Sequence, residues 1–388
     1  MKIAETVDEA DFRQQVRAWL VANVPREPRP EEADAQRDFD VAWRRRQFDG
    51  GWGHIAWPGP YGGRGLPLAS QIIWFEECAR AKAPGHIDMF FVALQHAGPT
   101  LIACGNERQK SFHLPLILRG EAIWCQGFSE PGAGSDLAAI RTRGEVDGDS
   151  LVINGQKIWT SFGRSARYQE LLIRTDPASS RHQGLTFVIC DMSTPGIEVR
   201  PIRNLVGGDD FCEVFYDDVR VPLENVVGDL GKGWEVAMST LGFERGAASI
   251  PQVIELTRGV EELLEYVASS TSGHHAPPFA ASEIGAKLAA ARADAAALKA
   301  MVHLMIARNA AGSEGSMVRL FLSELAQRVS NIAMDILGPD SLDRDALGGW
   351  PRHYLLALKH TIAGGTSEIQ RNIIGERILG LPRGAKGR

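Results

Sequence analysis

Residues 124–136 read Trp124-Cys125-Gln126-Gly127-Phe128-Ser129-Glu130-Pro131-Gly132-Ala133-Gly134-Ser135-Asp136, and this stretch decides how the rest of the chain is interpreted. Its glycines, its proline and its small hydroxyl and acidic side chains predict a turn that brings backbone N–H groups and side-chain oxygens against a flat polar ligand. A solvent-exposed loop is the commoner explanation for such a composition. The binding interpretation is favoured by a second stretch, Asn154-Gly155-Gln156-Lys157-Ile158-Trp159-Thr160-Ser161, which supplies a large aromatic side chain and two hydroxyl groups.

The composition is that of a large globular protein. With 388 residues, of which 44% are hydrophobic and 23% charged, the chain can bury a sizeable core in two or three structural layers. Its net charge of −6 gives no basic surface for nucleic acid, and no stretch approaches the about 18 consecutive apolar residues of a membrane helix. Acidic residues near the N-terminus (Glu5, Asp8, Glu9 and Asp11) are unlike a secretory signal or transit peptide, so we expect a cytoplasmic protein.

The cysteines and histidines predict neither disulfides nor a metal site. The five cysteines are odd in number, widely spaced and in no C-x-x-C pair, which argues against a disulfide framework and against zinc. The ten histidines are scattered, and the pair His274-His275 falls in a Ser- and Pro-containing loop. Metal binding is therefore not expected.

Hydrophobic periodicity divides the chain into three parts. Residues 1–121 show helical spacing after a capping box formed by Thr6 and Glu9. Residues 122–230 contain short β-rich runs, which predict a small antiparallel β domain. Residues 231–388 return to helical spacing.

Some local features of these parts can be predicted as well. The glycine- and aromatic-rich segment 51–65 is expected to be a packed loop, and a long helix is expected to end at Gly338. The pairs Asp147-Gly148 and Asn154-Gly155 are typical of hairpin turns. The pairs Asp209-Asp210 and Asp217-Asp218 are expected at strand ends.

The order of helices, β domain and helices, together with three motifs, resembles the acyl-CoA dehydrogenase family of flavoproteins. The motifs are the loop 124–136, the segment Trp159-Thr160-Ser161 and the segment Gly364-Gly365-Thr366-Ser367-Glu368-Ile369-Gln370-Arg371. The resemblance covers nearly the whole chain and implies an α+β fold with FAD as the cofactor. It places these residues at the flavin: Gln126, Phe128, Ser129, Gly134, Ser135, Trp159, Thr160, Ser161, Thr366 and Glu368.

The resemblance also implies how these residues act. In the family the loop wraps the pyrimidine side of the flavin, and the serine matching Ser135 also reaches the acyl-CoA. The tryptophan matching Trp159 packs against the ring, with a hydroxyl group, here Ser161, at the flavin N5 edge.

The implied reaction is the α,β-dehydrogenation of an acyl-CoA thioester to the trans-2-enoyl-CoA, with a hydride passing to flavin N5. Removing the α proton needs a carboxylate base, and the charge that develops needs donors at the thioester carbonyl oxygen. The commonest family members carry the base immediately before the Gly-Thr of the third motif, where this chain has Gly364. The backbone N–H of residue 364 remains, and the family aims this group at the thioester carbonyl. Gly365 is expected beside the substrate.

Glu244, in Leu241-Gly242-Phe243-Glu244-Arg245-Gly246, is the base that the resemblance implies instead. One branch of the family, which includes isovaleryl and long-chain enzymes, carries its base in a Glu-Arg pair on this helix. The alternative is a solvated surface pair, against which the apolar neighbours argue. Arg245 is expected to contact CoA or the active site. The family's acidic or amide residue two positions before the base is Gly242 here, so one substrate contact stays undefined.

Partners follow from the same resemblance, namely an acyl-CoA substrate and an electron-transferring flavoprotein. Many members have an Arg-x-x-Phe-Gly segment that a neighbouring subunit lays on the flavin pyrophosphate. This chain instead has the loop around His274 to Phe279, and it has Gly338 to Leu342 at the turn near the adenine. A homotetramer and a heterotetramer with a related subunit therefore both stay open.

Two other functions also stay open. A flavin monooxygenase on the same fold would lack a base at the position of Glu244. A non-catalytic subunit of a heteromeric acyl-CoA dehydrogenase would not turn over alone. The acyl group cannot be read from the sequence, because pocket depth depends on side chains whose placement the sequence does not define.

Overall fold

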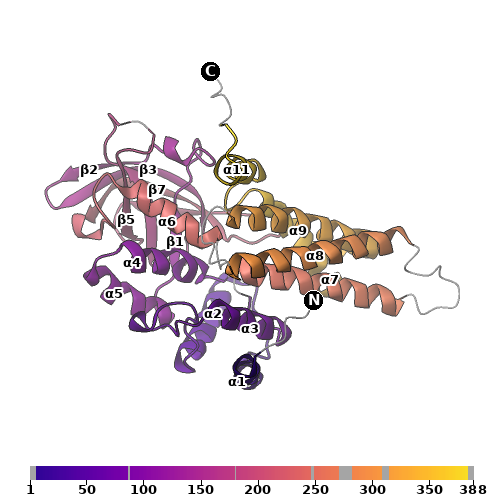
Figure 1. Ribbon diagram of the computed structural model, residues 1–388. Coiled ribbons are helices and arrows are strands. Elements are labelled where there is room, and N and C mark those ends of the chain that lie inside the picture. Colours follow the sequence, from indigo (N-terminus) through magenta and orange to yellow (C-terminus); the bar gives the residue numbers. More distant parts are fainter. Residues whose placement is uncertain are drawn as a thin grey trace. The chain divides into compact units, whose positions relative to one another are not determined.

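A computed structural model describes residues 6–85, 88–179, 181–245, 249–270, 282–307 and 314–382. Only the backbone is described for residues 244, 245, 270, 306 and 307. The chain forms two compact units, Met1–Phe243 and Glu244–Arg388, whose elements are labelled in Figure 1.

The first unit opens with helices. Their bounds are α1 (Val7–Asn23), α2 (Ala33–Asp49), α3 (Leu68–Arg80), α4 (Gly98–Cys104) and α5 (Glu107–Leu118), with a 3₁₀ turn η1 (Gly59–Tyr61) and a π-helical turn η2 (Ala93–Ala97) between them. The predicted capping box of α1 is confirmed. Glu9 N donates to Thr6 Oγ1 at 3.2 Å, and Thr6 N donates to Glu9 Oε2 at 2.8 Å.

Tryptophan side chains hold these helices together. Trp52 and Trp74 stack with ring centroids 4.8 Å apart, and Trp19 lies 5.7 Å from Trp43. Trp52 and Trp57 are buried, which confirms that the glycine- and aromatic-rich segment is a packed loop. Aromatic pairs of this kind stabilise a core beyond their buried area.

The β domain is one twisted sheet. Its strands are β1 (Trp124–Gly127), β2 (Arg143–Asp147), β3 (Ser150–Ser161), β4 (Tyr168–Arg174), β5 (Leu185–Asp191), β6 (Ile197–Ile202) and β7 (Phe211–Pro222). Within the described residues their order is β1-β4-β2-β3-β7-β6, and β5 pairs with β4. The pairs β2–β3, β3–β7, β4–β5 and β6–β7 are antiparallel. β1 pairs with β4 in parallel, and β2 meets β4 in parallel at Arg143.

The hairpin predicted at Asn154-Gly155 is wrong, because both residues lie inside β3. The register of β3 against β7 shifts between Ile153 and Gly155. A Cβ added at Gly155, whose φ is 149°, would lie 2.7 Å from Thr142 Cα. Glycine is needed there for close backbone approach rather than for a turn.

The same bulge corrects a second prediction. Asp217-Asp218 lies inside β7 and not at a strand end. Asp218 has φ 50°, and its N–H donates to Asn154 Oδ1 at 3.0 Å. By contrast, Asp147-Gly148 does form the predicted turn between β2 and β3, with φ 64° at Gly148.

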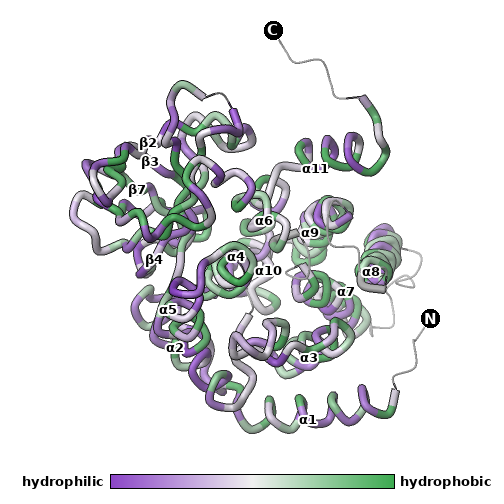
Figure 2. Tube along the Cα trace, turned by 60° about the vertical axis from the view of Figure 1, so that its left-hand side comes forward, coloured by the Kyte–Doolittle hydropathy of each residue, from purple (hydrophilic) through white to green (hydrophobic). Residues whose placement is uncertain are grey.

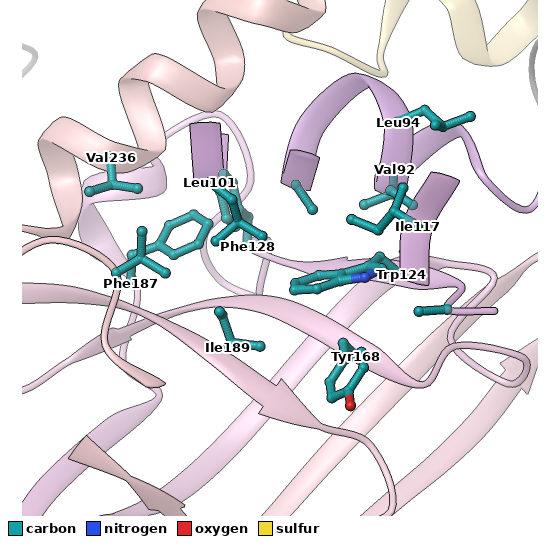
Figure 3. Packing of buried hydrophobic residues seen from close by; sticks show 14 of the residues in the cluster. Val92, Leu94, Leu101, Ile117, Trp124, Phe128, Tyr168, Phe187, Ile189 and Val236 are labelled. Carbon is teal, nitrogen blue, oxygen red and sulfur yellow. The ribbon is translucent and has the colours of Figure 1, made fainter. Parts of the chain in front are cut away.

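Apolar side chains cover both faces of the sheet. One face forms a core within the β domain from Leu151, Ile153, Leu171, Ile173, Val188, Cys190, Cys212, Val214, Tyr216, Val219 and Val221. The other face packs against the helices of the first unit, including α6 (Gly233–Arg245). Figure 3 shows Trp124 between Tyr168 of β4 and Ile117 of α5. Trp124 is 1% exposed, so it is a core residue as predicted.

The second unit is helical. Its main helices are α7 (Ile250–Ser270), α8 (Glu283–Ala307), α9 (Gly315–Leu337), α10 (Ala346–Ala357) and α11 (Ser367–Ile373). Figures 1 and 2 both show α7, α8 and α9 side by side. The predicted end of the long helix is confirmed, because Gly338 caps α9 with φ 53°. The segment around His274 to Phe279 lies outside the described residues.

Candidate functional site

The loop after β1 is fastened through Glu130. Its Oε2 accepts from Arg141 N at 2.6 Å, and its Oε1 accepts from Thr142 N at 2.8 Å. Its backbone exchanges two hydrogen bonds of 3.0 Å with Ala133. The turn Glu130–Ala133 is therefore closed on itself and tied to the segment that leads into β2.

Lys157 joins this loop to β3. Its side chain is fully buried, and Nζ donates to Glu130 Oε1 at 2.9 Å and to Phe128 O at 3.0 Å. The next residue, Ile158, donates its N–H to Ser129 O at 3.0 Å. The two stretches that the sequence singled out are thus joined by a buried ion pair and adjacent backbone contacts.

Burial perturbs both members of the pair. It lowers the pKa of Lys157 from its ordinary 10.5 to about 8, although the charge of Glu130 opposes this shift. Burial also opposes ionisation of Glu130, but Lys157 and the backbone donors outweigh it and lower the pKa of Glu130 below its ordinary value. The site therefore stabilises Glu130 in its charged, carboxylate form.

β3 is strained immediately beyond the lysine. Trp159 has φ 61° and Phe162 has φ 57°, and the register against β7 shifts between Lys157 and Thr160. The left-handed region costs such bulky residues on the order of 1–2 kcal/mol each, and strain of this kind gathers at functional sites. Trp159 is nevertheless 59% exposed. The backbone thus holds a large flat side chain on the surface, beside the residue that is bonded to the loop.

The residues predicted at the cofactor differ in how exposed their side chains are and in which polar atoms are free to bind a ligand. Phe128 is 4% exposed and its carbonyl is bonded to Lys157, so its side chain belongs to the core. Ser129 and Ser161 are half-buried, and Ser135 is exposed. Thr160 is buried, and its Oγ1 has no hydrogen-bond partner in the described part of the chain.

The loop also has open backbone. A Cβ added at Gly132 or Gly134 would meet no described atom within 4 Å, and neither glycine has a positive φ. The described residues therefore give no internal reason for glycine at these positions, whereas close approach of a ligand does. Open backbone, hydroxyl groups and an exposed indole together fit a flat aromatic cofactor such as a flavin.

A cavity of about 510 Å³ lies beside the end of the loop. Its lining includes one carboxylate, Asp136, and four guanidinium groups, those of Arg141, Arg143, Arg174 and Arg181. Arg181 lies 3.7 Å from Asp136, and both side chains are more than half exposed. This excess of positive charge fits a ligand with several negative charges, such as phosphate groups.

Arg174, one of the lining residues, is bonded to the backbone around the cavity. Its guanidinium donates to the carbonyl oxygens of Ala138 at 2.8 Å, Ile140 at 3.1 Å, Arg181 at 3.0 Å and Gln183 at 3.2 Å. These bonds hold the segments on either side of the cavity together. The other three arginines also line the cavity, and Arg143 Nε lies 3.5 Å from Glu145 Oε1.

The C-terminal motif forms a glycine turn in the second unit. Gly364 has φ 67° and Gly365 has φ 94°. Gln370 Nε2 donates to Gly364 O at 2.8 Å, and Thr366 caps α11 by accepting from Ile369 N at 3.3 Å. A glutamate at position 364 would be strained in this conformation, which glycine adopts without penalty.

Glu244 and Arg245 are the last two residues of α6, and only their backbone is described. On the same helix Val236 is 5% exposed, whereas Gly242 is exposed. Glu244 and the glycine turn belong to the second unit, and the loop and β3 belong to the first. The catalytic role of Glu244 therefore stays a prediction.

Sequence reasoning gave no role to Lys157 or Gln370, which hold the two predicted binding segments in place. Lys157 lies in a strand-like, partly apolar stretch, and a lysine in such a stretch indicates a buried charge with a partner. Gln370 carries no such signal, because a glutamine in a first helical turn is ordinary.

The described residues contain no group of three or more His, Cys, Asp or Glu side chains that could hold a metal ion. All five cysteines are free thiols. No helix in the described ranges is long and apolar enough to cross a membrane.

Comparison with known proteins gives the family. Models of the acyl-CoA dehydrogenase N-terminal, middle and C-terminal domains match residues 6–121, 125–219 and 231–379. Acyl-CoA dehydrogenase IpdE1 of Mycobacterium tuberculosis is 39% identical over 98% of this chain and 100% of its own length. The chain belongs to the acyl-CoA dehydrogenase family of oxidoreductases, and the expected architecture is confirmed.

Solved structures agree with this assignment. A chain of the ChsE4-ChsE5 complex from Mycobacterium tuberculosis has a TM-score of 0.83 and 32% identity, over 99% of this chain and 100% of that chain. A chain of the Tcur3481-Tcur3483 steroid ACAD has a TM-score of 0.85 and 27% identity, over the same shares.

Proposed function

We propose that this chain catalyses the FAD-dependent α,β-dehydrogenation of an acyl-CoA thioester to the trans-2-enoyl-CoA. The proposal rests on the joint between the glycine-rich loop and β3. There the buried ion pair of Lys157 and Glu130 holds the loop in place. Trp159, which follows on β3, has a strained backbone and an exposed side chain. Such a surface is preorganised for a planar ring that also needs hydrogen bonds at its edge. Family membership supports a flavin as that ring.

The residues of the chain have distinct proposed roles. The Glu244 carboxylate takes the α proton, and the backbone N–H of Gly364 donates to the thioester carbonyl oxygen, where negative charge develops. When bound, FAD supplies the acceptor for the hydride that leaves the β carbon. Trp159 packs on the ring, and the Ser129 and Ser161 hydroxyls bond its edge. Ser135, Arg245 and Gly365 are proposed to contact the substrate, and Thr366 and Glu368 the cofactor.

The base can be tested by replacing Glu244 with glutamine, which keeps the size of the side chain but cannot accept the proton. We expect Glu244→Gln to lower turnover by about a thousandfold, the scale of a lost general base, and to leave the oxidised flavin spectrum intact. Glu235→Gln, at an exposed residue in the first turn of the same helix, is the matched control and should retain activity. Near-wild-type turnover in Glu244→Gln would refute this base.

The arginine-lined cavity supports CoA as the carrier of the acyl group. We propose that Arg141 and Arg143 bind its phosphate groups, since an arginine forms charge-assisted hydrogen bonds with phosphate. Arg141→Gln/Arg143→Gln should raise KM for an acyl-CoA by about tenfold. It should leave KM for the matching acyl-pantetheine, which lacks the nucleotide, unchanged. Arg220→Gln, at an exposed residue of β7, is the control, and an equal loss with both substrates would count against the assignment.

We propose that electrons pass on to an electron-transferring flavoprotein and that the functional assembly is a tetramer with a related second subunit. Two of the similar structures are each named for two different proteins, ChsE4-ChsE5 and Tcur3481-Tcur3483. This supports a heteromer. The description of the latter as a steroid ACAD makes a steroid side-chain thioester a substrate to include in assays. Mass measurement of the protein expressed alone tests the assembly, and a flavin-saturated homotetramer would contradict it.

A further inference from the structure

A cluster of three polar side chains, two of them buried, lies where the sheet packs against the helices. Gln126 Nε2 donates to Glu170 Oε1 at 2.7 Å and lies 3.3 Å from His96 Nδ1. His96 Nδ1 lies 3.5 Å from Glu170 Oε1. Glu170 is 0% exposed and His96 is 4% exposed, whereas Gln126 is half-buried. A carboxylate removed from water is costly, so its presence here calls for a role that an apolar residue could not fill.

Backbone geometry sets the positions of all three residues. Gln126 and Glu170 are direct partners in the parallel pair of β1 and β4, so their side chains leave the same face. His96 lies in the π-helical turn η2, a rare geometry that is frequent at functional sites. That turn is held from behind by Trp57, whose Nε1 donates to Leu94 O at 3.2 Å.

The turn is also in direct contact with Trp57. A Cβ added at Gly98, directly after η2, would fall 1.9 Å from Trp57 Cζ2. The indole thus packs against bare backbone at Gly98. This contact and the bond to Leu94 O hold η2, and with it His96, against Trp57.

Glu170 decides which way the Gln126 amide faces. The Gln126 amide nitrogen faces the Glu170 carboxyl group and donates to its Oε1, so the amide oxygen points away from Glu170. No described residue donates a hydrogen bond to Gln126 Oε1. The network therefore leaves an oriented, half-buried acceptor at the start of the glycine-rich loop.

We propose that Glu170 and His96 are positioning residues that hold Gln126 so that its Oε1 accepts the imide N–H of the flavin pyrimidine ring. The inference rests on the proposed function, which places that ring at this loop. An oxidised isoalloxazine has a single N–H donor, the imide between its two carbonyl groups, and every other polar atom of the ring is an acceptor. An amide of fixed orientation is complementary to that donor, whereas a freely turning amide would present its N–H groups half of the time.

The test compares FAD with 3-methyl-FAD, which lacks the imide donor, for binding to the apoprotein of the full chain. We expect the wild type to bind FAD at least about tenfold more tightly than 3-methyl-FAD. In Gln126→Leu the preference should fall to about twofold or less, because the acceptor is gone. Glu170→Leu should also lose the preference, since the amide is free to turn. Glu170→Gln should keep most of it, because its own amide oxygen can still accept from Gln126.

A purely structural role makes a different prediction. Gln169→Leu is the matched control, because Gln169 precedes Glu170 on β4 but faces the other side of the sheet, where it accepts from the Tyr216 hydroxyl. It should lower stability without changing the preference for FAD. A preference that persists in Gln126→Leu would overturn the inference and attribute the effect of the methyl group to its size. Failure of the wild type to bind FAD at all would instead overturn the proposed function on which the inference rests.

Discussion

The loop–β3 joint of the first unit and the glycine turn of the second unit are fixed by different means. The joint uses a buried ion pair, Lys157 with Glu130, and a strained tryptophan. The turn is held by hydrogen bonds to neutral groups, with Gln370 on Gly364 O and a threonine cap. Buried charges are costly and rigid, whereas neutral bonds are cheaper to rearrange. The segment proposed to hold the cofactor thus depends on a buried ion pair, whereas the segment proposed to cover the acyl group depends on hydrogen bonds to carbonyl oxygens.

A charged donor also reaches the residues before the turn, but it binds neutral carbonyl groups. Arg319 donates to Ala363 O at 2.7 Å and to His360 O at 3.1 Å. These bonds hold the residues that precede the glycine turn. Ile362, next to them, is 66% exposed. In the joint, by comparison, the ion pair is almost entirely removed from water.

Breaking the ion pair should give the largest effect on stability. Lys157→Met keeps the length and apolar stem of the side chain but leaves the Glu130 carboxylate buried without its cation. We expect a loss of about 3–5 kcal/mol in the free energy of unfolding, the scale of an unpaired buried charge. Urea unfolding of the apoprotein measures it. Lys232→Met, at an exposed lysine, should change the free energy of unfolding by less than about 0.5 kcal/mol.

A loss of less than about 1 kcal/mol in Lys157→Met would contradict the view that the pair locks the joint. In that case the backbone hydrogen bonds to Glu130 would be sufficient to hold the loop, and both regions would depend on hydrogen bonds alone.

The pH dependence of the free energy of unfolding reports on the same ion pair. The pKa of Lys157 is lowered from 10.5 to about 8 in the folded protein, so between these values the unfolded chain binds more protons than the folded one. The free energy of unfolding then gains a term that rises with pH over this range. We expect the stability difference between the wild type and Lys157→Met to increase from pH about 7.5 to about 9.5. A constant or shrinking difference would contradict the direction of the shift.

Loosening the glycine turn should have a smaller effect. Gln370→Leu removes the donor to Gly364 O and Gly365 O, and we expect a loss of about 1–2 kcal/mol for orphaned carbonyl groups. Hydrogen exchange at the amides of α11 would report it locally. Arg371→Gln, which breaks an exposed ion pair with Glu324, should cost no more than about 0.5 kcal/mol. Equal effects of the two changes would show that the glutamine does not hold the turn.

The strain at Trp159 should give the smallest effect. Glycine accepts φ 61° without penalty, whereas alanine does not, so Trp159→Gly should be more stable than Trp159→Ala by about 1 kcal/mol in the apoprotein. Both variants should bind FAD more weakly than the wild type, because the indole is lost. If alanine proved as stable as glycine, the backbone at this position would not be strained.

Much of the fold could be predicted from the sequence, because its signals are local. The capping box of Thr6 and Glu9, the turn at Asp147-Gly148 and the end of α9 at Gly338 each depend on neighbouring residues. The prediction at Asn154-Gly155 was wrong because this residue pair occurs both in hairpin turns and in bulges. The contact with Thr142, which is distant in sequence, distinguishes the two.

The candidate site could be predicted in part. The loop and the Trp159 segment were identified by composition and by resemblance, but their joint by Lys157 depends on a contact across 27 residues. The cluster of His96, Gln126 and Glu170 draws on separate elements and has no motif. Contacts of this kind follow from strand register and helix placement, which no short stretch of sequence determines.

An anaerobic titration of the purified protein with acyl-CoA thioesters, followed by the absorption of the oxidised flavin, tests the proposed dehydrogenation and its base together. The set should include straight-chain, branched, aromatic and steroid side-chain acyl groups. We predict that at least one of them bleaches the flavin band in the wild type and that none does so at a comparable rate in Glu244→Gln. A protein that carries flavin but is reduced by no thioester, alone or with its partner subunit, would contradict the account.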